Sequence, residues 1–214
     1  MNKTNLSILG DSISTYKGIS DNPDINASII CNQSFYKPPF SQEDTYWEIL
    51  IKRLSLKLCV NNSYSGGNLS GKDDPCSGIN RAYNLSRNDG TSPDIIILFM
   101  GINDLGRGVP PELFEKDYAL TLRILKEKYP EAYVCCVHIP DRDPVLKKRA
   151  QIFNSSIEKA VRDMGSGYFI ADLFSSRLNN DFYYINTRDG LHPDEDGMRI
   201  IADVIEDTIR RVVS

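Results

Sequence analysis

Five short, almost continuously apolar runs alternate along this chain with longer segments in which apolar residues recur every three or four positions. Strands that are buried on both faces have continuous apolar runs, and helices that cover a sheet carry an apolar stripe on one face. The pattern therefore predicts an α/β fold, a three-layer sandwich with a five-stranded parallel sheet at its centre. The predicted strands are residues 5–9, 57–62, 94–100, 132–139 and 167–171.

Helices are expected between these strands and after the last one. The four apolar stripes of helical period span residues 47–58, 114–129, 146–164 and 198–212. Thr45 and Glu48 have capping-box spacing ahead of the first stripe. We interpret the stripes as core packing, and this includes Trp47. A short helix is expected at 79–85, within the second of two long polar connections, residues 13–43 and 63–93.

Length, charge and hydropathy favour one domain spanning residues 1–214. The chain has no repeat or linker, and 25 basic against 29 acidic residues give a net charge of −4 without a basic stripe. Nucleic acid is therefore not expected as a partner. No apolar stretch approaches the roughly 20 residues of a membrane span, and the N-terminal residues lack a signal-peptide pattern. We expect no membrane partner and a cytoplasmic location, and the oligomeric state stays open.

The five cysteines do not form a recognisable pattern. They are Cys31, Cys59, Cys76, Cys135 and Cys136, an odd number without CxxC spacing. Such usage suits neither a disulfide framework nor a zinc cluster, so we expect buried residues or free thiols. We predict no metal and no cofactor.

Polar residues follow the predicted strands at the places where ligands bind to parallel sheets. Ser12, Gly66 and Asn103 come directly after the first three strands, and Asp189 and His192 precede the last helix. The carboxyl ends of parallel strands share one edge of the sheet, so these residues are expected to meet there. Taken singly, each is an ordinary turn or cap residue.

Together these five residues supply every part that ester cleavage requires. We predict that Ser12 is the nucleophile and His192 its base, with Asp189, three residues earlier, orienting the imidazole. The backbone N–H groups of Ser12 and Gly66 and the side-chain amide of Asn103 would form an oxyanion hole.

Four motifs carry a resemblance to a known family. In chain order they are Gly10-Asp11-Ser12, Gly66, Gly101-Ile102-Asn103-Asp104 and Asp189-x-x-His192. They resemble the four blocks of the GDSL/SGNH hydrolase superfamily, whose letters S, G, N and H fall on Ser12, Gly66, Asn103 and His192. The opening reads GDSI, with Ile13 in place of the usual leucine. The resemblance implies a flavodoxin-like fold and esterase or lipase activity.

The substrate is expected to be a small polar ester. Aromatic residues of segment 13–43, namely Tyr16, Phe35, Tyr36 and Phe40, are interleaved with polar residues, which suits stacking on a polar ligand more than binding a long acyl chain. Tyr46, Tyr183 and Tyr184 would extend such a surface. We therefore predict a short-acyl esterase, a deacetylase of a carbohydrate or similar metabolite. The alternative is a lysophospholipase or acyl-thioesterase.

Two other classes of function are less favoured. Residues 66–73 nearly spell a phosphate-binding P-loop, but Asp73 stands where the magnesium-binding hydroxyl should be, and Pro75 interrupts the helix that should follow. A non-catalytic binding module would be expected to have a damaged triad, whereas every member is present. His138 ends the fourth predicted strand and is assigned no role.

Overall fold

The computed structural model describes residues 4–140, 145–176 and 186–212. Five parallel strands form one sheet in the order β2-β1-β3-β4-β5, which is the strand order of flavodoxin-like folds. The bounds are β1 (Asn5–Gly10), β2 (Lys57–Asn61), β3 (Ile95–Phe99), β4 (Tyr133–Val137) and β5 (Tyr168–Ala171). The predicted fold class is confirmed, and each strand lies within two residues of its predicted bounds.

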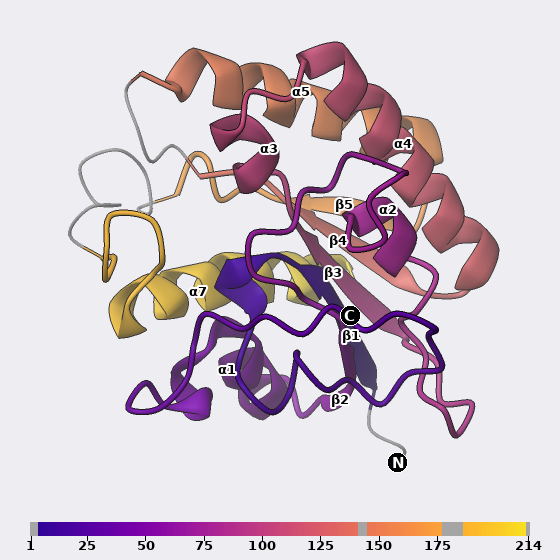
Figure 1. Ribbon diagram of the computed structural model, residues 1–214, viewed down its shortest axis with the longest axis vertical. Helices are drawn as coiled ribbons and strands as arrows, with labels where there is room; N and C mark the ends of the chain where they lie inside the picture. Colours follow the sequence, from indigo (N-terminus) through magenta and orange to yellow (C-terminus); the bar gives the residue numbers. More distant parts are fainter. Residues whose placement is uncertain (1–3, 141–144, 177–185, 213–214) are drawn as a thin grey trace.

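Helices cover both faces of the sheet (Figure 1). On one face α1 (Tyr46–Arg53) packs against α7 (Glu195–Val212), and on the other α4 (Pro111–Lys128) packs against α5 (Lys147–Met164). The short helices are α2 (Gly78–Arg81), α3 (Ile102–Gly106), η1 (Ser12–Ser14) and η2 (Gln42–Asp44).

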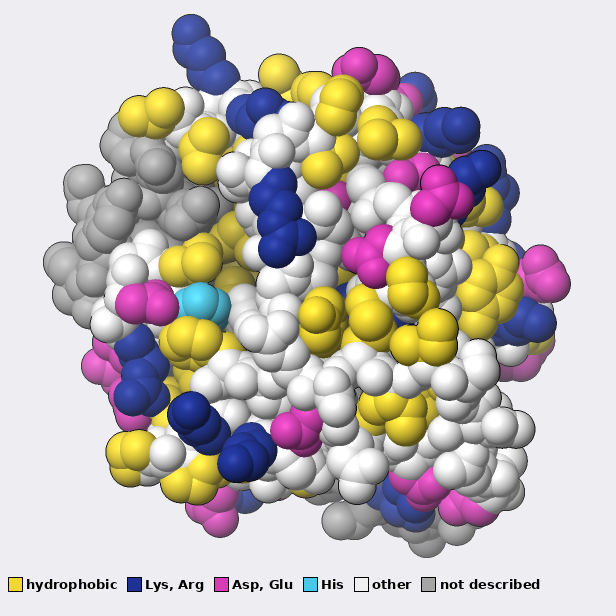
Figure 2. Space-filling model, in the orientation of Figure 1, with side chains coloured by type: hydrophobic (Ala, Val, Ile, Leu, Met, Phe, Trp, Pro, Cys, Tyr) yellow, Lys and Arg dark blue, Asp and Glu magenta, His cyan; other side chains and the backbone are white. Residues whose placement is uncertain are grey.

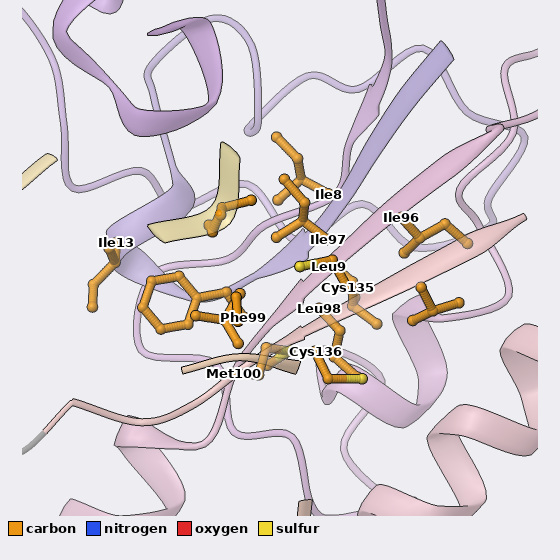
Figure 3. Close-up of a cluster of buried hydrophobic side chains, with 14 of the residues drawn as sticks. Ile8, Leu9, Ile13, Ile96, Ile97, Leu98, Phe99, Met100, Cys135 and Cys136 are labelled. Carbon is orange, nitrogen blue, oxygen red and sulfur yellow. The ribbon is translucent and has the colours of Figure 1, made fainter. Parts of the chain in front are cut away.

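The core lies between these helix layers, with β3 at its centre. Ile96, Ile97 and Leu98 have no exposed surface, and Figure 3 shows them beside the thiols of Cys135 and Cys136 on β4. Burying one such aliphatic side chain contributes about 1.5–3 kcal/mol, so a strand buried on both faces stabilises the fold strongly. The continuous apolar run of β3 in the sequence has this physical origin.

Some helices end at other residues than the apolar periodicity predicts, because a turn ends the helix first. Thr45 caps α1 by accepting a hydrogen bond from the Glu48 N–H, as the capping-box spacing predicts. The helix nevertheless ends at Arg53, because Ser55 adopts a positive φ of 53°, and Leu58 belongs to β2. The helix predicted at 79–85 is a single turn, and α3 was not predicted at all.

A disulfide corrects the expectation for two cysteines. Cys31 and Cys76, 45 residues apart, are bonded and join the two long connections, whereas Cys59, Cys135 and Cys136 are free and buried. Neither connection has a regular period, so nothing in the sequence indicated that the two thiols would meet. Disulfides persist mainly in oxidising compartments, which argues against the predicted cytoplasmic location.

Within the described ranges, none of the helices is both apolar and long enough for a bilayer span.

Candidate active site

The candidate site lies at the carboxyl ends of β1 and β3. Ser12 opens η1 directly after β1, and Asn103 lies in the first turn of α3 directly after β3. From β1 the chain passes to β2 on one side, and β3, β4 and β5 then follow on the other side of β1. The point between β1 and β3 is therefore a topological switch point, and ligands of doubly wound sheets bind at such points.

The turn that carries Ser12 is held by short-range hydrogen bonds. The Asp11 carboxylate accepts from the Ile13 N–H at 3.1 Å, and the Thr15 hydroxyl donates to the Ser12 carbonyl at 2.8 Å. Position 10 has no room for a larger residue than glycine, because a Cβ there would lie 2.3 Å from the Ser14 Oγ. The hydroxyl of Ser12 therefore leaves the sheet from a rigid turn.

Ser12, His192 and Asp189 form a hydrogen-bonded chain. His192 Nε2 lies 2.9 Å from Ser12 Oγ, and His192 Nδ1 lies 2.8 Å from Asp189 Oδ2. The other carboxylate oxygen of Asp189 accepts from the backbone N–H of His192 at 2.7 Å. An isolated antiparallel bridge between Thr187 and Pro193 closes this turn at its base. The structure thus brings together the nucleophile, base and orienting carboxylate expected from the sequence, in the geometry of a hydrolase triad.

The Asp189 carboxylate is held in its charged form. Its partial burial raises the pKa, but the hydrogen bonds from His192 outweigh that effect and hold the pKa of Asp189 below its usual range. An ionised carboxylate at Nδ1 favours the tautomer with the proton on that nitrogen. The lone pair of Nε2 is then free to accept the proton of Ser12.

Aromatic residues of the connection 13–43 position His192. The Phe35 ring stacks on the imidazole with centroids 3.4 Å apart and planes 12° apart, and the Tyr36 hydroxyl donates to the Pro193 carbonyl at 2.7 Å. Tyr16 and Phe40 are buried, so these two of the four aromatic residues expected to contact a ligand form the core of this connection instead. Phe35 and Tyr36 both line a pocket at this place.

The other aromatic predictions have mixed outcomes. Tyr46 and Trp47 have no exposed surface, which confirms the core assignment of Trp47 and removes Tyr46 from the ligand surface. Tyr183 and Tyr184 lie outside the described residues.

The three hydrogen-bond donors expected to form an oxyanion hole come from the loops after β1, β2 and β3. In the part of the chain that the structure describes, the N–H groups of Ser12 and Gly66 make no hydrogen bond. The Asn103 amide donates to the Gly67 carbonyl at 3.0 Å, which leaves its second N–H available. The Gly67 N–H is already bound to the Tyr64 carbonyl, so Gly66, with a φ of 78°, is the glycine suited to an oxyanion hole.

Arg81 is a positioning residue that the sequence did not reveal. Its buried guanidinium donates to the carbonyls of Gly10, Asn62 and Cys76, and thereby ties the ends of β1 and β2 to the second connection. Burial lowers the pKa of Arg81 to about 10, so the group stays charged at neutral pH. Its three acceptors lie at the end of β1, just after β2 and in the second connection, so no local pattern could have indicated this role.

Asp104, within the third motif, organises the loop that follows Gly66. Its buried carboxylate accepts from the N–H groups of Leu69 at 2.7 Å and Ser70 at 2.9 Å. Those amides are the kind that a P-loop would offer to a phosphate, and the next helix begins only at Gly78. The near-P-loop sequence is therefore bound to a carboxylate, which agrees with the rejection of nucleotide hydrolysis.

His138 belongs to a separate pair at the end of β4. Its Nδ1 lies 3.0 Å from Asp172 Oδ1, which accounts for a buried histidine without a role in the triad. Among the described residues, no group of three or more His, Cys, Asp or Glu side chains is arranged to hold a metal ion.

Comparison with known proteins identifies the class. The sequence matches the model of the GDSL-like lipase/acylhydrolase family over residues 4–209. The chain therefore belongs to this family of carboxylic ester hydrolases, as its four motifs had indicated. No curated protein gives a significant match.

Solved structures share the fold over nearly the whole chain. A protein described as a GDSL-like lipase from Bacteroides ovatus is 24% identical with a TM-score of 0.74, over 99% of this chain and 100% of that one. A carbohydrate esterase family 3 from Talaromyces cellulolyticus is 16% identical with a TM-score of 0.68, over 98% of each chain. A family two carbohydrate esterase from Clostridium thermocellum, in complex with cellohexaose, is 15% identical with a TM-score of 0.72, over 98% of this chain and 64% of that one.

Proposed function

We propose that Ser12, His192 and Asp189 are the catalytic triad of an esterase that removes short, acetyl-type acyl groups from a carbohydrate or similar small polar substrate. The observation that carries this proposal is the continuous hydrogen-bonded chain from Ser12 Oγ through the imidazole to the Asp189 carboxylate. The alternative within the same family is a lysophospholipase or acyl-thioesterase.

The geometry leads to a two-step mechanism. Ser12 Oγ attacks the ester carbonyl while its proton passes to His192 Nε2, and the Ser12, Gly66 and Asn103 donors stabilise the oxyanion. The tetrahedral intermediate collapses when His192 gives that proton to the leaving alkoxide, and an acyl-Ser12 ester remains. Water, deprotonated by the same imidazole, then hydrolyses this ester and regenerates Ser12.

The surroundings of the site support a polar substrate. A pocket of about 390 Å³ is lined by Phe35, whose ring stacks on His192, and by Tyr36, Pro38 and Pro39. The polar side chains of Gln33, Ser34 and Ser65 also face it. Hydroxyl and amide groups around an aromatic face suit a sugar ring, whereas a long acyl chain requires a continuous apolar channel. Two of the solved structures described above are carbohydrate esterases by name, which agrees with this choice.

A chain-length series of p-nitrophenyl esters tests the proposal. We expect hydrolysis without added metal or cofactor, and a maximum of kcat/KM at the C2 to C4 esters. The Ser12→Ala protein provides the background rate for every ester. A maximum at C8 or longer would favour the lipase alternative and contradict the short-acyl assignment.

A further inference from the structure

The pocket beside His192 adjoins the triad through three of its lining residues. The Phe35 ring covers one face of the imidazole, Arg188 directly precedes Asp189, and Ser65 directly precedes Gly66. The pocket therefore adjoins the candidate active site.

Within the described lining of this pocket, every charged side chain is a cation. Lys37 and Arg188 are both exposed there, and neither forms an ion pair with a carboxylate in the described part of the chain. The Arg188 guanidinium lies 5.3 Å from the centre of the Phe40 ring, which gives it a defined position. A chain with a net charge of −4 thus presents two cations without an ion-pair partner among the described residues beside its candidate active site.

A third cation lies on the other side of the oxyanion loop. A Cβ placed on Gly66 would lie 3.3 Å from the Arg107 Nη2, and the Arg107 Nη1 donates to Asn68 Oδ1 at 2.8 Å. In Figure 2, Lys and Arg side chains lie on both sides of the visible histidine side chain, and an acidic side chain lies directly beside it. Arg107 therefore adds a third positive charge next to the oxyanion loop.

The pocket adjoins the imidazole that would protonate the leaving alcohol. In the proposed mechanism, His192 Nε2 gives its proton to the alkoxide oxygen, so the alcohol portion departs past the imidazole. Phe35 stacks on that imidazole and lines the pocket together with Lys37 and Arg188, so these two cations lie near the residue that would protonate the alcohol portion.

From this geometry we infer that the alcohol portion of the substrate carries an anionic group, a carboxylate or a phosphate, that binds to Lys37 and Arg188. An acetylated acidic sugar is the class of substrate that would bind in this way. The inference deepens the proposed function and rests on it. Arginine matches a carboxylate or phosphate through paired N–H donors, and the neighbouring lysine adds a second positive charge.

Two matched pairs of substrates test the inference. Monoacetylated methyl glucuronide is compared with monoacetylated methyl glucoside, and 1-acetylglycerol 3-phosphate with 1-acetylglycerol. We expect kcat/KM to favour the anionic member of at least one pair by about tenfold at low ionic strength, chiefly through KM, and the preference to shrink as salt screens the charges. The pair with the larger ratio identifies carboxylate or phosphate as the anion.

Charge-neutral variants show where the preference originates. In Lys37→Gln and Arg188→Gln proteins, and most strongly in the double variant, the anionic-to-neutral ratio should fall towards one. Lys57→Gln removes the same charge at the amino end of β2, on the opposite edge of the sheet, and should keep the wild-type ratio. A ratio near one in the wild type, or a preference that persists in the double variant, would overturn the inference. The proposed function would still stand in that case if the wild-type protein hydrolyses p-nitrophenyl acetate. A wild-type protein that fails to hydrolyse p-nitrophenyl acetate would overturn both.

Discussion

At the scale of single residues, Asn103 offers a sharp test of the oxyanion hole. Loss of its amide donor should lower kcat by roughly 10²- to 10³-fold with little change in KM, because the donor stabilises charge that develops only in the transition state. Steady-state kinetics of Asn103→Ala on p-nitrophenyl acetate measures both constants, and Asn103→Asp provides a variant of the same shape without the donor. A change mainly in KM would instead assign Asn103 to ground-state binding.

The residues of the candidate site differ in how far the sequence could predict them. Ser12, Asn103 and His192 follow strands or precede a helix within recognisable motifs, and the structure brings them to the same edge of the sheet. Their catalytic roles remain predictions. Arg81 and Phe35 act through contacts with distant loops, and such contacts leave no local pattern in a sequence.

At the scale of elements, the disulfide between Cys31 and Cys76 should stabilise the protein by restraining the two long connections in the unfolded chain. For a loop closed between residues 45 apart, chain entropy predicts about 4 kcal/mol as an upper figure. Replacing both cysteines by serine should therefore lower the urea midpoint and Tm markedly. Cys59→Ser, which alters a buried free thiol, is the control for cysteine loss itself. An unchanged unfolding free energy in the double variant would contradict this role.

Elements with a clear period were predictable, and elements without one were not. The apolar run of β3 and the stripe of α7 each follow from burial against the same core. The connection 13–43 has no period, so its packing on His192 and its disulfide could not be read from the sequence. The short helix α3 was likewise missed, because five residues are too few to show an apolar stripe.

At the scale of the whole molecule, Asp11 should make stability depend on pH. Burial raises the pKa of Asp11 from 3.8 to about 7, so the folded protein binds this proton more tightly than the unfolded chain does. Its contribution is fully present below about pH 3.8 and is lost progressively as pH rises to about 7. Asp11→Asn keeps an acceptor for the Ile13 N–H but cannot ionise.

Urea unfolding of the wild type and of Asp11→Asn at pH 5 and pH 8 measures this effect. Relative to the wild type, the variant should be more stable at pH 8 than at pH 5, by an amount on the order of a kcal/mol or more. Comparing the two pH values removes any constant cost of the substitution beside Arg81. Equal pH dependence in the two proteins would show that Asp11 does not titrate as described.

Covalent labelling of the nucleophile tests the central claim most directly. A fluorophosphonate should react with Ser12 Oγ, with loss of fluoride, because only a serine activated by a base attacks such a reagent readily. We expect one label per chain, located on the peptide containing Ser12 by mass spectrometry, and loss of ester hydrolysis in step with labelling. Ser12→Ala should take up no label and lose activity by on the order of 10⁶-fold. A label on another residue, or near-native activity of Ser12→Ala, would contradict the account.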